Sequence, residues 1–128
     1  MNDAINPADL NAELRHDVFV SDVCEQQQLW LLADGEQYCL LRIDEEECLP
    51  VWPSEEQAQA WNSDDSMRAK AVPLTVWLQR WVPGMIAEGS RVAVFPGSAG
   101  DAVVVTPQEL ADSLRAGLAG STADSEVP

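Results

Sequence analysis

The sequence predicts a single α+β domain, with helices packed on an antiparallel or mixed sheet of about five strands. Three observations support this class. The length of 128 residues fits one domain. Apolar residues recur at helical spacing in several segments, and short apolar or β-branched runs bounded by turn residues lie between those segments. The predicted order is α-β-β-β-α-α-β-β-α, with the domain at residues 1–118 and a disordered acidic tail at 119–128.

The first predicted helix begins at Asn6-Pro7, because asparagine is a favoured N-cap and proline is tolerated at the first helical position. It is expected to run to about Cys24, with Val18–Val23 as a strand in an alternative interpretation that stays open. Its apolar stripe consists of residues four apart, namely Leu10, Leu14 and Val18.

Three strands are predicted to follow as a meander. Leu29–Ala33 and Gln37–Ile43 are joined by Asp34-Gly35, which suits a two-residue turn because both residue types tolerate positive φ. The acidic run Asp44–Glu47 is expected to be a solvated turn, and Cys48–Trp52 is the third strand.

A proline ends the third strand and a short helix comes next. Pro53 has no N–H to donate to a strand partner. Ser54 and Gln57 have the spacing of a capping box, so a helix is predicted over Ser54–Asn62. Residues 63–72 are expected to be loop, with a short extended piece at about 69–72.

The most amphipathic segment begins at Pro73. Pro83-Gly84 is expected to kink this helix or make it restart, because an interior proline removes a hydrogen bond and clashes with the preceding turn. The apolar residues have the spacing of one buried helix face, and they are Leu74, Trp77, Leu78, Trp81, Val82 and Met85.

A hairpin and a last helix complete the prediction. Arg91–Phe95 and Ala102–Val105 are β-branched runs joined by a longer, glycine-rich loop. Thr106 and Glu109 have capping-box spacing, with Pro107 at the first helical position. The core face of this helix is predicted to be Leu110, Leu114 and Leu118.

The charge excludes several classes of partner. The chain has 22 acidic and 7 basic side chains and a formal net charge of −15. This disfavours nucleic acid and anionic membrane surfaces, which proteins bind through Lys and Arg. It permits a cationic partner and equally suits a well-solvated surface. When the chain is divided at residues 27, 53, 72 and 96, only the segment 73–96 lacks net negative charge, because Arg80 and Arg91 outnumber Glu88.

Neither a membrane span nor a secretory signal is predicted, because no apolar run is long enough and the N-terminus lacks a basic and an apolar region. The odd number of cysteines indicates a cytoplasmic protein with reduced thiols. His16 is the only histidine, and the spacing of Cys24, Cys39 and Cys48 fits no zinc motif, so no metal or other cofactor is expected. No nucleophile-elbow or phosphate-loop string occurs, which disfavours an enzyme.

Several separated strings form a distinctive set. They are Cys48–Ser54 with Glu55, Ala58 and Trp61, then Val72–Leu74, Trp81–Met85, Val92–Pro96 and Val103–Pro107. Together they resemble the bacterial domain-of-unknown-function family numbered 2750, which is mainly proteobacterial. The resemblance covers roughly residues 10–118 and implies fold and compartment, but it supplies no catalytic residue.

The tryptophans are the leading candidates for a binding surface. Arg80 is expected to stack on Trp77 or to pair with Glu55 or Glu56. The rings are expected either to pack in the core or to form an aromatic pocket with an acidic lip. Four of the five lie close together in sequence, namely Trp52, Trp61, Trp77 and Trp81.

The leading functional hypothesis is a non-enzymatic protein-interaction module that binds a partner with a basic surface through this region. Two alternatives stay open. One is a small-molecule or enzymatic pocket lined by the same tryptophans, with Cys48 or Arg80 inside. The other is an acidic decoy or immunity-type inhibitor of a basic protein. The sequence assigns no oligomeric state.

Overall fold

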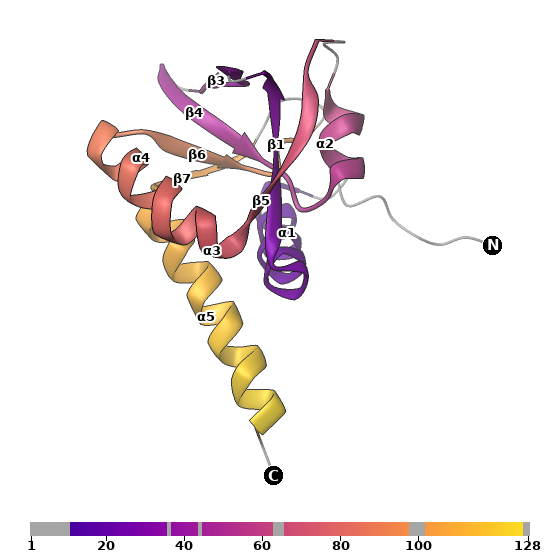
Figure 1. The fold of residues 1–128 in the computed structure, drawn as a ribbon, viewed down its shortest axis with the longest axis vertical. Coiled ribbons are helices and arrows are strands. Elements are labelled where there is room, and N and C mark those ends of the chain that lie inside the picture. Colours follow the sequence, from indigo (N-terminus) through magenta and orange to yellow (C-terminus); the bar gives the residue numbers. More distant parts are fainter. Residues whose placement is uncertain (1–10, 36, 44, 63–65, 98–101, 127–128) are drawn as a thin grey trace, which may run out of the picture.

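Two small sheets with helices around them form an α+β fold, as Figure 1 shows for this computed structural model. The structure describes residues 11–35, 37–43, 45–62, 66–97 and 102–126, and side chains up to residue 118. The predicted α+β class is confirmed.

The elements follow each other in this order: α1 (Ala12–Gln26), β1 (Gln28–Asp34), β2 (Gln37–Tyr38), β3 (Leu41–Ile43), β4 (Glu46–Val51), α2 (Glu55–Trp61), β5 (Arg68–Pro73), α3 (Leu74–Val76), the π-helical segment η2 (Trp77–Trp81), α4 (Val82–Glu88), β6 (Arg91–Val94), β7 (Val103–Val105) and α5 (Pro107–Glu126).

The strands divide into a three-stranded sheet, β2-β1-β5, and a four-stranded sheet, β3-β4-β6-β7. All neighbouring strands are antiparallel except β4 and β6, which are parallel. An isolated antiparallel bridge between Trp30 and Trp52 joins the two sheets. The helix α2, the strand β5 and the helical segment from α3 to α4 form the crossover between β4 and β6.

Both antiparallel pairings of the predicted meander are present, but its middle strand is divided between the two sheets. The backbone N–H of Cys39 still donates to the Leu32 oxygen at 2.9 Å, after which the chain leaves β1, and only Leu41–Ile43 pairs with β4. One predicted strand therefore becomes two short strands in different sheets. The region 68–73, predicted mainly as loop, is a strand that pairs with β1 over six residues. The sequence gives only a weak signal for this strand, because it contains alanine and lysine, which are uncommon in strands.

The two turns also differ from the predicted ones by a residue or two. Asp34 pairs with Gln37, so the tight turn starts at Gly35, whose φ of 64° is the left-handed conformation that glycine adopts readily. The acidic turn is shorter than predicted, because Glu46 already pairs with Ile43 in the strand ladder.

The buried face of α1 lies one residue further along than the sequence predicts. The described helix starts after the N-cap Asn11, whose side chain accepts from the Leu14 N–H, while Asn6-Pro7 lies outside the described residues. Leu14 is 47 % exposed. The alternative strand at Val18–Val23 is wrong, since α1 spans it. The buried residues of the helix are Arg15, Phe19, Val23 and Cys24.

Pro83 shapes the amphipathic helix without ending it. The Val82 N–H donates to the Trp77 oxygen, five residues back, so the turn before Pro83 is π-helical. An α-helix would place the proline ring against the carbonyl of Gln79, and a wider turn relieves that clash. The wider turn also lets Trp77 and Val82 both face the core. The predicted kink thus takes the form of a π-helical turn, and the helix ends at Gly89, whose φ is 74°.

Both predicted capping boxes start helices. The Ser54 oxygen accepts from the Gln57 N–H at 3.2 Å. At the start of α5, the Thr106 hydroxyl accepts from the Glu109 N–H at 3.0 Å, and the Glu109 carboxylate accepts from the Thr106 N–H at 2.9 Å. The helix α5 runs on to Glu126, beyond residue 118, at which the predicted domain ends.

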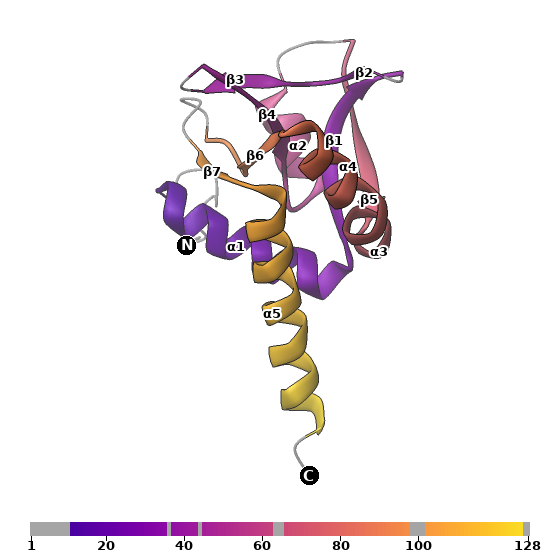
Figure 2. The same ribbon diagram turned by 90° about the vertical axis from the view of Figure 1, so that its left-hand side faces the viewer.

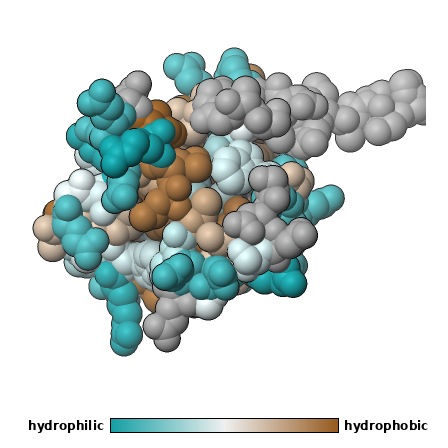
Figure 3. Space-filling view, turned by 90° about the horizontal axis from the view of Figure 1, so that it is seen from above, coloured by the Kyte–Doolittle hydropathy of each residue, from teal (hydrophilic) through white to brown (hydrophobic). Residues whose placement is uncertain are grey.

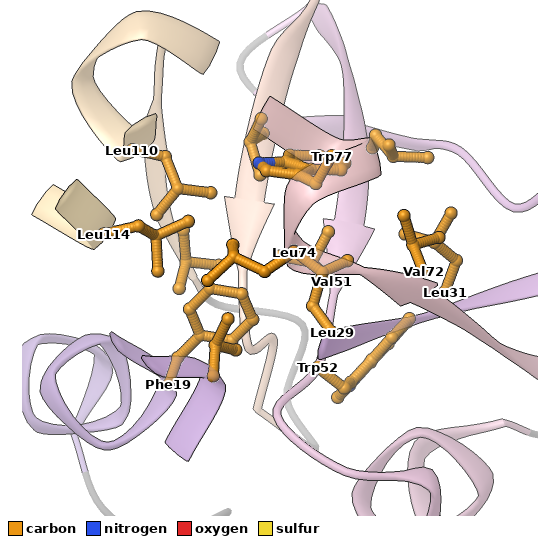
Figure 4. Packing of buried hydrophobic residues seen from close by; sticks show 14 of the residues in the cluster. Phe19, Leu29, Leu31, Val51, Trp52, Val72, Leu74, Trp77, Leu110 and Leu114 are labelled. Carbon is orange, nitrogen blue, oxygen red and sulfur yellow. The ribbon is translucent and has the colours of Figure 1, made fainter. Parts of the chain in front are cut away.

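The core lies where α1, α5 and the two sheets meet (Figure 4). Phe19 of α1 packs there with Leu110 and Leu114 of α5, and all three are fully buried. Figure 2 shows α5 crossing α1 and then extending away from the sheets. Arg15 is also buried, and its Nε donates to the Phe95 oxygen at 2.9 Å. That bond helps to hold Phe95 in its strained backbone conformation, with φ of 47°.

Candidate functional site

The sheet β2-β1-β5 separates the tryptophans into two groups. Directly paired residues point to the same face of a sheet, and residues two apart on one strand do as well. Trp30 and its bridge partner Trp52 therefore share one face, which α2 covers. Tyr38, Lys70 and Leu31 share the opposite face. Trp77 packs on that opposite side, and Figure 4 shows it apart from Trp52.

The Trp52–Trp61 pair belongs to the core. Its ring centroids are 5.3 Å apart, and Trp52 is fully buried. Trp61 is half-buried, and its indole N–H donates to the Gly97 oxygen at 3.0 Å. Among the residues with described side chains, no ring contact joins this pair to Trp77 or Trp81. The four tryptophans predicted as one surface are thus two separate pairs.

A stack of aromatic rings on the other face runs from the core to the surface. Trp77 is fully buried, and the half-buried Trp81 stacks on it with centroids 5.8 Å apart. Tyr38 meets Trp81 edge to face at 5.0 Å. The Lys70 ammonium then lies 5.4 Å from the Tyr38 ring centroid and 3.4 Å from its hydroxyl. The buried end anchors the stack, so Trp81 and Tyr38 are held in place where they reach solvent.

A pocket of about 250 Å³ opens beside this stack. One wall comes from the strands β2 to β4 and the other from Trp81 and the helix α4; Figure 2 shows α4 beneath β2 and β3. Trp81, Met85 and Glu88 line up because they lie at i, i+4 and i+7 of a helix. The complete lining is Tyr38, Leu40, Glu47, Leu49, Trp81, Met85, Glu88 and Ser90.

The pocket is apolar at its base and acidic at its rim. Leu49 and Met85 are buried, while Glu47 and Glu88 are exposed. Leu40 is 53 % exposed at the mouth, which makes it the most exposed large apolar side chain in the described chain. Figure 3, seen from above, shows hydrophobic surface at this end of the molecule with hydrophilic side chains around it. Such a pocket suits a side chain that has an apolar stem and a cationic head.

Arg80 and Glu55 lie apart from this pocket. Arg80 is exposed and lines an adjoining hollow of about 290 Å³ that shares Trp81, Met85 and Glu88 with the pocket. Glu55 is exposed on α2, on the far side of the sheet. Within the described residues, Arg80 forms no ion pair with Glu55 or Glu56, and the cation that contacts a ring is Lys70. Cys48 is buried in β4.

Sequence reasoning missed Tyr38, Leu40, Glu47 and Glu88. Tyr38 and Leu40 fall where one predicted strand divides into two, so their common orientation was hidden. Glu88 had a usable signal, since it continues the i, i+4, i+7 row from Trp81 through Met85. The sequence predicts a solvated turn at Glu47, whereas this residue belongs to β4 two residues before Leu49 and therefore points to the same side.

A second hollow, of about 500 Å³, lies between α1 and α5 and contains His16 and Cys24. Burial raises the pKa of the Cys24 thiol, and its Sγ donates to the Leu114 oxygen at 3.3 Å. A raised pKa disfavours the reactive thiolate. No group of three or more His, Cys, Asp or Glu side chains in the described chain is placed to hold a metal ion. No disulfide joins the three cysteines, and no described helix has the length and apolar character needed to cross a bilayer.

Comparison with known proteins finds a family whose model matches most of the chain. The family model described as "Protein of unknown function (DUF2750)" matches residues 16–114. This range contains the sheets, the pocket and the buried half of α5. No curated protein matches the chain.

Proposed function

The chain belongs to the DUF2750 family, and we propose that it is a cytoplasmic, non-enzymatic module that binds the basic surface of a partner protein. The observation that supports this best is the pocket beside Trp81, where an apolar base and two aromatic rings meet two glutamates. Aromatic rings fixed by packing are common anchors of protein interfaces, because little side-chain freedom is lost on binding.

The net charge of −15 favours a basic partner over an acidic one. Long-range attraction would speed the encounter, and the pocket would supply the specific contact. Of the tryptophans predicted to bind, Trp81 is the one in the pocket. In this proposal Trp77 supports Trp81 from below, Arg80 borders the site, and Trp52, Trp61 and Glu55 belong to the other side of the sheet.

Two matched variants separate specific binding from general attraction. Leu40 and Leu14 are similarly exposed, at 53 % and 47 %, but Leu14 lies on α1 and does not line the pocket. We expect Leu40→Asn to weaken binding of a fluorescein-labelled lysine-containing peptide at least about five-fold, the effect of about 1 kcal/mol. Leu14→Asn keeps the net charge and should leave binding unchanged.

The measurement is fluorescence anisotropy at two ionic strengths, since salt screens the general attraction more than the contacts in the pocket. No loss in either variant would show that the peptide is held by charge alone, and an equal loss in both would show that the contact is not confined to the pocket; either result would refute the proposed site.

A further inference from the structure

We infer that the pocket beside Trp81 receives a single lysine side chain of the partner, with Glu47 and Glu88 pairing with its ammonium group. This inference rests on the proposed function and specifies its ligand. It follows from how polarity changes between the base of the pocket and its rim. Leu49 and Met85 are buried at the base, and the carboxylates are exposed at the rim.

The apolar base excludes a ligand that is polar throughout, because burying an unpaired polar group is costly. The two carboxylates exclude an anion, since like charges repel. A lysine side chain meets both conditions, because its four-carbon stem is apolar and its ammonium is a compact cation. The rings of Tyr38 and Trp81 add a further attraction for a cation placed near them.

The protein already places a cation of its own against this aromatic stack. The Lys70 ammonium lies 5.4 Å from the Tyr38 ring centroid, on the sheet face that carries the stack. Lys70 is exposed and does not line the pocket. It shows that the Tyr38 ring accepts an ammonium group, and its charge opposes the approach of a second one. Lys70 therefore limits the affinity of the pocket for the partner's lysine.

The test uses two peptides, acetyl-Gly-Gly-Lys-Gly-Gly-amide and the same peptide with norleucine in place of lysine. Norleucine keeps the apolar stem and lacks the ammonium. Binding is followed by NMR through the methyl resonance of Met85, which lines the pocket. We expect the lysine peptide to bind at least about five-fold more tightly than the norleucine peptide, as an ammonium that pairs with both carboxylates should.

Matched variants assign the contribution of each charge. Glu47→Gln and Glu88→Gln should each weaken lysine binding by about two- to five-fold, the range for exposed ion pairs, and leave norleucine binding unchanged. Glu56→Gln removes the same charge from α2 on the other side of the sheet and should have no effect. Lys70→Met should strengthen lysine binding by about two-fold, whereas Arg115→Met on α5 should not.

The outcomes are distinguishable. Equal binding of the two peptides, insensitive to Glu47 and Glu88, would overturn this inference but leave the pocket as an apolar anchor site. Binding of neither peptide at the Met85 methyl would overturn both the inference and the proposed site.

Discussion

Gly117 of α5 lies against α1 so closely that adding one methyl group there tests the packing of these helices directly. A Cβ atom at this position would lie 2.7 Å from the Cys24 Sγ and 3.4 Å from a Val20 methyl carbon. Moving the sulfur aside would break its hydrogen bond to the Leu114 oxygen of the same helix α5. Gly117→Ala should therefore force α1 and α5 apart or distort the Cys24 side chain.

The size of the effect follows from two opposing contributions. Overpacking of this kind costs about 1–3 kcal/mol. Alanine in place of glycine inside a helix gains about 1 kcal/mol. We expect Gly117→Ala to lower the free energy of unfolding by about 0–2 kcal/mol in the natural chain. In a Cys24→Ala background the close contact is gone, so the same substitution should raise the free energy of unfolding by about 1 kcal/mol.

The assay is urea unfolding of the four proteins of this cycle, followed by tryptophan fluorescence. The coupling between the two positions should be about 1–3 kcal/mol, well above the additivity error of distant sites. If Gly117→Ala changed stability equally in both backgrounds, Gly117 and Cys24 would not be in contact, and the placement of α5 on α1 would be wrong.

Three further predictions concern groups that shape the fold. Arg15→Met should lower the free energy of unfolding by about 2–3 kcal/mol in urea titrations, because the buried Phe95 oxygen loses a charged donor, whereas an unchanged midpoint would contradict the buried contact. Thr106→Ala should cost about 1 kcal/mol by the same assay, because the hydroxyl that accepts from the Glu109 N–H is lost; no loss would mean that this cap does not form. Burial, and secondarily Glu25, raise the pKa of Asp22. The protonated carboxyl group therefore contributes fully to folding stability below the unfolded-state pKa, and this contribution is lost as pH rises through the folded-state pKa. Asp22→Asn should raise the melting temperature at pH 7 but not at pH 3, and an equal rise at both values would refute this.

Local signals predicted the starts of α2 and α5 well. Serine and threonine caps act within four residues, so Ser54 and Thr106 mark helix starts without help from the rest of the fold. The predicted burial of Leu74, Trp77, Val82 and Met85 is confirmed for the same reason, since it depends on one helix face.

Local sequence signals do not predict which strands pair when the strands are far apart in the chain. The strand β5 has small and charged residues and becomes a strand because β1 lies beside it. The sheet it forms then separates Trp52 from Trp77, so closeness in sequence did not give closeness in space. The pocket was missed for a related reason, since its two walls come from segments about 40 residues apart that only tertiary packing brings together.

The central claim is that a basic partner binds beside Trp81 and not at the other tryptophans. Each of the five indole N–H groups gives its own NMR signal, so one titration with the lysine-containing peptide reports on all of them. We predict a saturable shift of the Trp81 signal, with a smaller shift at Trp77 beneath it and none at Trp52 or Trp61 across the sheet. A titration that moves Trp52 or Trp61 and leaves Trp81 unchanged would contradict the account.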